Sequence, residues 1–256
     1  MKTSLLTRIF LSFFLLMMAS AASTQTLTAT EIVRKAQDKV NGSSSRGIMK
    51  MTIVRPGWSR EVTMKTWSLG TDFSMIYITS PAKDVGQVFL KRDNDMWNWI
   101  PSINRMIKIP PSMMGQSWMG SDFTNDDLVK MNSMVDDYQH QITGSEVIDG
   151  YECYIIELVP KPEATVVWGK IRVWISKKEY FELRAEYYDE DGVLANYMTG
   201  GDIKLMGDRM LPARMVMIPM DTEKEGHETR LEMVEMQFNV KIAEDFFSQQ
   251  NMKSVR

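Results

Sequence analysis

The sequence predicts a mainly β protein of the α+β class, built on a single antiparallel sheet. From Arg46 onward, apolar residues alternate with polar ones over short stretches, a period of two that is typical of strands with one buried face. Turn signals of the Asp-Gly and Pro-Gly kind separate these stretches, as expected for consecutive hairpins. One stretch of helical periodicity comes before them. These observations predict an antiparallel meander with one N-terminal helix packed on its apolar face.

The first residues have the pattern of a secretory signal peptide. Lys2 and Arg8 precede an apolar run over residues 9–18, and the small residues at 19–21 suit a signal peptidase. The run is too short to span a bilayer stably. We therefore expect a cleaved signal peptide over residues 1–22 and one exported domain over residues 23–256.

An amphipathic helix is predicted over residues 30–40. Thr28 and Glu31 have the spacing of a capping box, and Gly42 follows the predicted helix. Its apolar side chains recur at helical spacing: Ile32, Val33, Ala36 and Val40. This stripe requires a partner, and the rest of the chain offers mainly sheet.

The predicted strands cover most of the remaining chain. They are residues 49–53, 60–68, 73–77, 87–91, 96–100, 105–109, 135–143, 151–159, 171–175, 181–188, 194–205, 211–219 and 229–240. A sheet of ten or more twisted strands with one apolar face tends to curl until it closes or wraps around a filler. The first helix and residues 110–131 are available as fillers. Within the latter, Thr124 and Asp127 can cap a short helix that ends at Met131.

Residues 109–121, IPPSMMGQSWMGS, form an apolar segment without any charge. Its proline pair and glycines prevent one long helix or strand, so we predict an irregular, mobile flap that contacts an apolar ligand. Methionine is abundant, with 23 residues in the chain. Unbranched, polarizable methionine suits surfaces that repack around varied apolar ligands, although it can also replace leucine in an ordinary core. Trp97 and Trp99 share one strand face and are interpreted either as core or as the floor of a cavity.

Several classes of function lack support in the sequence. The formal charge of −3 is mild and unclustered, which argues against a nucleic-acid partner. Cys153 is the only cysteine and is expected to be a small buried side chain in a strand. His140 and His227 have no metal-ligand spacing around them, and no nucleophile or phosphate-binding motif occurs. We therefore expect no cofactor, no metal and no enzymatic activity.

The series MWNWIPSINRMIKIP followed by SWMGSDFTNDDL resembles the outer-membrane lipoprotein-sorting protein family, the LolA-like relatives of the periplasmic lipoprotein carrier. The resemblance covers nearly the whole mature chain. It implies an unclosed β-barrel, a strongly curved open sheet whose concave apolar face is covered by the first helix and a short lid helix. It also implies a non-catalytic carrier of acyl chains between membranes, with a lid latched by an arginine on an early strand. Arg46, Arg55 and Arg60 are the candidates.

These arguments lead to a periplasmic, monomeric carrier or chaperone for the acyl chains of lipoproteins or other lipids. An inner-membrane transporter and an outer-membrane acceptor are the implied protein partners. The predicted ligand-binding residues comprise a concave wall of Met49, Met51, Phe73, Met75, Trp97 and Trp99, and a lid of Met113, Met114, Trp118 and Met119. The wall depends on strand register, because a slip of one residue turns every side chain to the other face.

Two other functions remain open at the level of sequence. The first is an envelope interaction protein that docks a partner such as a lipid transporter and carries no lipid of its own. The second is a hydrolase of envelope material, which would need the acidic residues Asp122, Asp126 and Asp127 in catalytic roles. We instead interpret these carboxylates as structural, since they flank a helix start where anions suit the helix dipole.

Overall fold

The structure, a computed structural model, describes residues 27–130 and 134–256. The expected signal peptide, residues 1–22, and the predicted helix end at Met131 lie outside the described residues. Within these ranges, none of the helices has the length and apolar character needed to cross a membrane.

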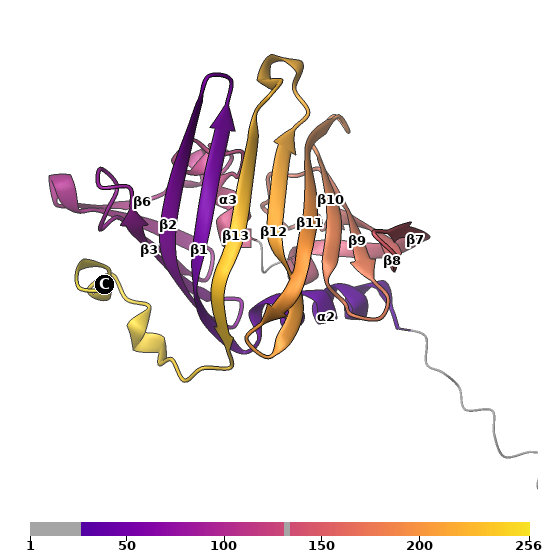
Figure 1. The fold of residues 1–256 in the computed structure, drawn as a ribbon, viewed down its shortest axis with the longest axis horizontal. Coiled ribbons are helices and arrows are strands. Elements are labelled where there is room, and N and C mark those ends of the chain that lie inside the picture. The colour runs from indigo at the N-terminus through magenta and orange to yellow at the C-terminus, as the bar shows by residue number, and fades with distance from the viewer. Residues whose placement is uncertain (1–26, 131–133) are drawn as a thin grey trace, which may run out of the picture.

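One antiparallel sheet of thirteen strands dominates the part of the chain that the structure describes (Figure 1). The first six strands are β1 (Ser44–Arg55), β2 (Trp58–Leu69), β3 (Phe73–Ser80), β4 (Val88–Arg92), β5 (Asp95–Ile100) and β6 (Arg105–Lys108). The others are β7 (Tyr138–Ile148), β8 (Tyr151–Pro160), β9 (Lys170–Ser176), β10 (Glu182–Tyr188), β11 (Leu194–Met206), β12 (Arg209–Pro219) and β13 (Glu228–Phe238). The predicted strand-rich, antiparallel fold is confirmed.

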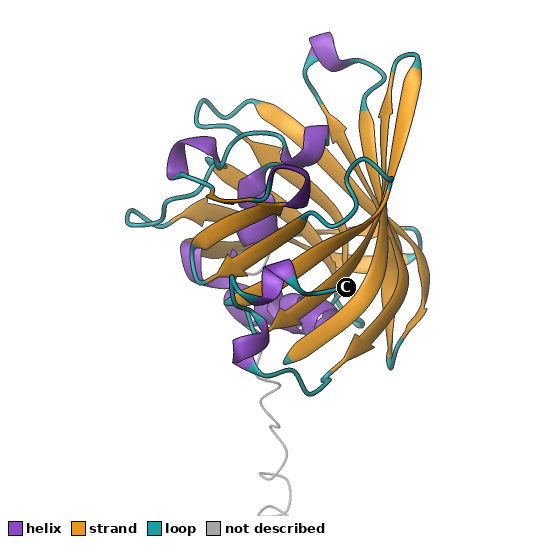
Figure 2. Cartoon of the chain, turned by 90° about the vertical axis from the view of Figure 1, so that its left-hand side faces the viewer, coloured by secondary structure: helices purple, strands orange, loops and turns teal. Residues whose placement is uncertain are grey.

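The strand order shows where the sheet is open. It runs β6-β5-β4-β3-β2-β1-β13-β12-β11-β10-β9-β8-β7, so each strand pairs with its neighbour in sequence except β6 and β7, which form the two edges. The first and last strands meet in the middle, where Met51 pairs with Leu231. The chain between β6 and β7 therefore leads from one edge of the strongly curved sheet to the other (Figure 2). This connection contains the predicted flap.

Short helices lie in the connections and near the C-terminus. They are α3 (Asn125–Lys130), α4 (Met134–Asp137), η1 (Pro101–Ile103), η2 (Pro111–Met113), η3 (Trp118–Gly120), η4 (Thr222–Lys224), η5 (Glu244–Phe246) and η6 (Asn251–Lys253). The longest described helix is α2 (Ala29–Asn41), and its predicted start is confirmed because Thr28 and Glu31 form both bonds of the capping box. Gly42 ends it with a positive φ of 63°, a conformation that glycine adopts without a steric penalty.

Helix α2 buries its apolar stripe against the concave side of the sheet. Ile32, Val33 and Ala36 join one large core cluster with residues of β1, β8, β9 and the flap. In Figure 1, α2 and α3 lie behind the central strands, whereas the C-terminal segment lies beyond β2 and β3. The sheet is therefore covered on its concave face by α2 and the flap, and covered locally on its outer face by the C-terminal segment.

Alternate residues of β3 show this two-sided covering. Ile76 and Ile78 contact the concave core cluster, whereas Met75 and Tyr77 belong to a second cluster with Phe247 of the C-terminal segment. We call this second set the outer cluster; its buried members are Met75, Tyr77, Val88, Leu90, Trp99, Phe247, Met252 and Val255. Apolar side chains are therefore buried on both faces of the sheet in this region.

The predicted strand over residues 135–143 is wrong at its start. Residues 134–137 form α4, and β7 begins at Tyr138. Val135 and Tyr138 are both buried at a spacing of three, which a helical turn permits and a strand does not. His140 holds this junction, because its ring lies 2.9 Å from the carbonyl oxygen of Met134 and 3.1 Å from Thr30 Oγ1 of α2. Cys153 is fully buried in β8, as expected.

Candidate ligand-binding cavity

The flap is irregular, as predicted, and it is held by its own backbone. Its two turns, η2 and η3, are joined to the start of α3 by hydrogen bonds. The amide of Trp118 donates to the carbonyl of Phe123 at 2.8 Å, and the amide of Asp126 donates to the carbonyl of Met114 at 2.9 Å. Thr124 and Asp127 each bond the other's backbone amide through their side chains, so the predicted cap of the short helix is confirmed. The flap thus forms one folded unit.

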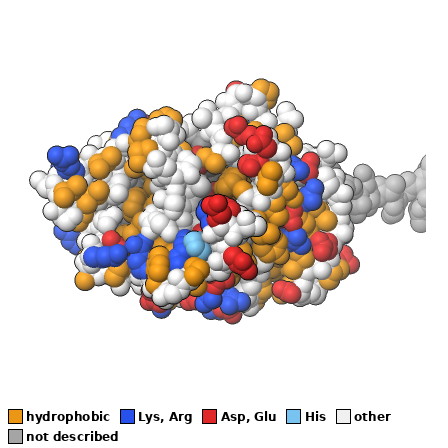
Figure 3. Space-filling view, turned by 90° about the horizontal axis from the view of Figure 1, so that it is seen from above, with side chains coloured by type: hydrophobic (Ala, Val, Ile, Leu, Met, Phe, Trp, Pro, Cys, Tyr) orange, Lys and Arg blue, Asp and Glu red, His pale blue; other side chains and the backbone are white. Residues whose placement is uncertain are grey.

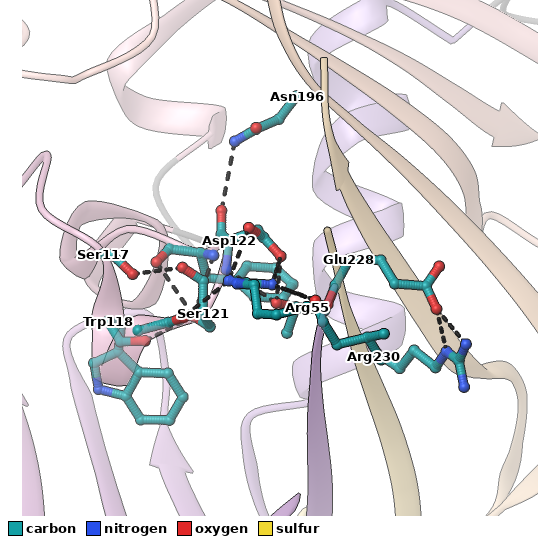
Figure 4. Close-up of polar contacts among 12 residues, drawn as sticks. Arg55, Ser117, Trp118, Ser121, Asp122, Asn196, Glu228 and Arg230 are labelled. Carbon is teal, nitrogen blue, oxygen red and sulfur yellow. Dashed lines mark hydrogen bonds and ion pairs between the residues drawn. The ribbon is translucent and has the colours of Figure 1, made fainter. Parts of the chain in front are cut away.

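A buried ion pair attaches this unit to the sheet (Figure 4). Arg55, the last residue of β1, donates to both carboxylate oxygens of Asp122 at 3.0 and 3.1 Å, and also to the carbonyl of Gly120 at 2.8 Å. Thr229 of β13 donates its hydroxyl to Asp122 at 2.6 Å. The Arg55 and Asp122 side chains are only 10% and 5% exposed. Of the three candidate arginines, Arg55 forms this buried ion pair, Arg60 of β2 donates to the carbonyl of Met119 in the flap, and Arg46 bonds Gln237.

Trp118 anchors the flap in the concave core. Its side chain is 2% exposed, and its ring meets Phe89 of β4 edge to face with centroids 5.3 Å apart. The indole nitrogen is buried and has no hydrogen-bond partner among the described residues. A buried donor without a partner costs free energy, so the apolar contacts of Trp118 must offset that loss.

A cavity of about 250 Å³ lies between α2, the chain around α3 and α4, and strands β1, β2 and β9 to β13. Its lining is largely apolar and includes six methionines: Met49, Met134, Met198, Met215, Met233 and Met236. Aromatic side chains of Phe123, Tyr138, Trp168 and Tyr187 complete the wall. Because methionine side chains are unbranched and adapt to irregular shapes, this lining can repack around chains of different length.

The ionisable groups that line the cavity are acidic or phenolic within the described residues. Asp127 accepts a hydrogen bond from the indole nitrogen of Trp168 at 2.8 Å, and burial raises the pKa of its carboxyl. Burial also raises the pKa of Glu182 to about 8. The described residues contain no cluster of His, Cys, Asp or Glu with the arrangement of a metal site. Seen from above, as in Figure 3, the molecule's surface carries charges of both signs interspersed with hydrophobic side chains.

Six of the ten predicted site residues fall into three groups. Met49 lines the cavity, and Met51 is fully buried in the same core cluster. Met114, Trp118 and Met119 pack on that cluster from the flap. Met113, in contrast, is exposed at 36%, and its carbonyl accepts a bond from Asn125.

The placement of four predicted wall residues is wrong. Phe73, Met75, Trp97 and Trp99 lie on the opposite face of the sheet, in or against the outer cluster. The prediction assumed that each strand has one dry and one wet face. The C-terminal segment buries the outer face here as well. Apolar residues therefore occupy both faces of these strands, and alternation alone cannot tell which of them face the concave side. Ile76, Phe89 and Met96 occupy the concave face of these strands instead.

Most residues that line the cavity come from the second half of the chain. Met198, Met215 and Met233 lie on β11, β12 and β13, outside the predicted wall and lid. The available signal was the density of methionines over residues 198–236, but the pairing of β1 with β13 had to be known before these could be placed beside Met49. A second hollow of about 610 Å³ is an open groove beside the C-terminal segment, and mostly polar residues line it.

Comparisons with known proteins agree with this architecture. A family model with the description "uncharacterized protein" matches residues 70–254, well over half of the chain. The chain belongs to the DUF1329 family. A DUF1329 family protein from Desulfovibrio piger is 24% identical, with a TM-score of 0.78, over 88% of this chain and 97% of the other. No curated protein matches the sequence.

Two further solved structures connect this DUF1329 protein to the LolA-like fold. A structure from Vibrio parahaemolyticus, described as an outer membrane lipoprotein-sorting protein domain, is 23% identical with a TM-score of 0.77 over 88% of this chain and 98% of that one. A LolA superfamily protein from Nitrosomonas europaea is 22% identical with a TM-score of 0.76 over 88% and 100%. The predicted resemblance is therefore confirmed at the level of the fold.

Proposed function

We propose that this protein is a periplasmic carrier that shelters the acyl chain of a lipoprotein or another lipid beneath its flap. The observation that carries the proposal is the methionine-lined cavity between α2 and the concave sheet. A mainly apolar hollow with a few polar groups is the usual form of a small-molecule site. The LolA-like fold supports a carrier rather than a catalyst.

In the proposed cycle the Arg55–Asp122 pair opens and closes the cavity. The cavity of about 250 Å³ is below the range of about 300–1,000 Å³ typical of ligand pockets, so this state accommodates only part of a chain. Opening the pair at a membrane or transporter would release the flap and let Trp118 withdraw from Phe89. The chain then enters, the methionines repack around it, and the pair forms again.

The magnitude of the expected binding suits a reversible carrier. Each buried methylene contributes about 0.8 kcal/mol, so ten to twelve carbons give a gross term of about 10 kcal/mol. Association entropy and the reordering of the flap remove several kcal/mol of this. The remainder corresponds to micromolar or tighter binding, which still permits release to an acceptor.

Native mass spectrometry of protein purified from the cell envelope tests the proposal. Met198→Trp fills the cavity, and Met210→Trp makes the same change on the surface, where Met210 is exposed. The proposal expects bound acyl species in the parent and in Met210→Trp, and their loss in Met198→Trp. An absence of lipid from all three proteins would instead favour a docking protein whose concave face is occupied only by its own helix and flap.

A further inference from the structure

A partly buried carboxyl group faces the cavity without a partner. Glu182, the first residue of β10, lines the cavity, and no hydrogen bond or ion pair joins its side chain to any described residue. Glu186 on the same strand provides the contrast, because its carboxylate pairs with Arg184 and Arg172 and accepts a bond from Tyr188 at 2.6 Å. The two glutamates differ in environment although they are four residues apart.

A β-bulge causes this difference. The register between β10 and β9 shifts between Glu182 and Arg184. Leu183 packs in a cluster with Trp174, and Arg184 also lies over the Trp174 ring, whereas Ala185 returns to the concave core. The bulge thus places two successive residues on the outer face and directs Glu182 to the concave one. Bulges commonly re-aim a side chain beside a functional site.

Gly200 on β11 makes room for the bulge. A Cβ atom at this position would lie 2.8 Å from the carbonyl oxygen of Glu182 and 3.5 Å from the Cα atom of Leu183. Glycine therefore allows β11 to approach β10 where the bulge occurs. The close approach of β11 at Gly200 accommodates the bulge that directs Glu182 to the concave face.

A second polar group in the same cavity also lacks a partner. Gln37 of α2 lines the cavity, and its side-chain oxygen is buried without a hydrogen bond to any described residue. A buried acceptor without a donor carries a desolvation cost that a bound donor would remove. Helix α2 and strand β10 therefore both present unsatisfied acceptors to the cavity.

The charges of the lining select against an anionic ligand. Its charged side chains within the described residues are Asp126, Asp127 and Glu182, with neither lysine nor arginine among them. A phosphate or a free carboxylate would be desolvated there without a cation to pair with. A hydroxyl or an amine would instead donate to the unsatisfied oxygens, and an ammonium group would also favour the ionised form of Glu182 and pair with it.

We propose that Glu182 and Gln37 form a polar subsite that receives the hydrogen-bond-donating end of a long-chain ligand, a primary amine or a hydroxyl. The inference rests on the proposed carrier function and names its ligand class. The methionines Met198 and Met215 hold the chain of the ligand, and Glu182 with Gln37 fixes its head.

Three ten-carbon probes with different heads test this subsite. Decylamine, decanol and decanoate, all below their micelle-forming concentrations, would compete with a fluorescent acyl probe for the purified protein. The subsite predicts that decylamine or decanol binds at least tenfold more tightly than decanoate. Glu182→Gln should remove the preference for decylamine over decanoate, and Gln37→Met should lower the affinity for decanol. Glu186→Gln should leave the order of the three affinities unchanged.

The outcomes separate the subsite from the carrier. Equal affinities of all three probes, unchanged in Glu182→Gln and Gln37→Met, would overturn the subsite and leave the carrier standing. Failure of every probe to compete would overturn both. Thermal unfolding of each variant establishes that it is folded, and the two substitutions lie on different elements, so one misfolded variant does not decide the result.

Discussion

The guanidinium of Arg55 bonds both carboxylate oxygens of Asp122, a residue 67 positions away in sequence. This contact joins the end of β1 to the segment that leads between the two sheet edges. Because both side chains are nearly buried, neither can be removed without leaving the other uncompensated. The flap is therefore held by this buried ion pair, by a hydrogen bond from Arg60 to the carbonyl of Met119, and by the apolar anchor Trp118.

Arg55→Met should destabilise the protein by about 3–5 kcal/mol, because it leaves the Asp122 carboxylate buried without its cation. Urea unfolding measures the loss, and amide hydrogen exchange should show faster exchange over the flap. Arg46→Met is the matched control, since Arg46 is exposed on the same strand and bonds Gln237. Equal stability of the two variants would contradict a role for Arg55 as the latch.

Adding Asp122→Asn to Arg55→Met should recover part of the lost stability, since the buried charge is then removed along with its partner. The double variant should still show the faster exchange over the flap, because the contact to β1 remains broken. If the free energy of unfolding in urea does not recover, the stability loss of Arg55→Met does not come from an unpaired buried charge on Asp122.

Phe247→Ala should lower stability by about 3–5 kcal/mol without changing the affinity for an acyl probe. Phe247 is fully buried in the outer cluster, and its removal leaves a cavity on the face opposite to the proposed site. Denaturant unfolding and probe competition on the same sample measure the two effects. A large loss of affinity in a folded variant would place the ligand on the outer face, beside Trp97 and Trp99.

Stability should fall as the pH rises from about 5 to 8 and level off above 8. Burial raises the pKa of folded Glu182 from 4.5 to about 8, so the folded state holds a proton that the unfolded chain releases over this range. One such group contributes a slope of up to about 1.4 kcal/mol per pH unit. Burial also raises the pKa of Asp127, which adds to the decrease in the free energy of unfolding. Tyr138 and Tyr187 have pKa values raised above that of free tyrosine and stay neutral over this range.

Glu182→Gln should reduce this slope, as seen from unfolding free energies between pH 5 and 9. Glu186→Gln is the control, because it removes a paired carboxylate and keeps Glu182. The same steep fall in both variants would show that Glu182 is not the titrating group.

Cys153 should resist thiol reagents while the protein is folded. Its side chain is fully buried and burial raises the pKa of the thiol, so little reactive thiolate forms. Ellman's reagent should react only at the rate of unfolding. Leu205→Cys, at an exposed position, should add one thiol that reacts at once; rapid reaction of the parent would contradict the burial of β8.

Much of the fold could be predicted because it depends on local patterns. The capping box of Thr28 and Glu31, the hairpin turns and the period-two strands all act within a few residues of sequence. The pairing of β1 with β13 connects the two ends of the chain, and no local pattern specifies it. The family resemblance implied that the sheet is unclosed, but only the structure places the open edges at β6 and β7.

The site was less accessible to sequence reasoning. The C-terminal segment buries apolar side chains on the outer face. Trp97 and Trp99 therefore show the same alternation in sequence as residues of a concave wall would. Glu182 faces the cavity because of a bulge, and one residue of register shift is invisible in the hydrophobic pattern. Arg55 could be named among three arginines, but only the structure shows that it pairs with Asp122, whereas Arg60 bonds the carbonyl of Met119 and Arg46 bonds Gln237.

The most direct test of the central claim is the methyl spectrum of the protein labelled with carbon-13 at its methionine methyl groups, recorded with and without decanol and assigned by single Met→Leu substitutions. A ligand in the concave cavity should shift the methyl signals of Met49, Met198, Met215 and Met233 and leave those of Met75 and Met252 in place. Shifts confined to Met75 and Met252, or no shift at concentrations where the probe competes, would contradict a binding site beneath the flap.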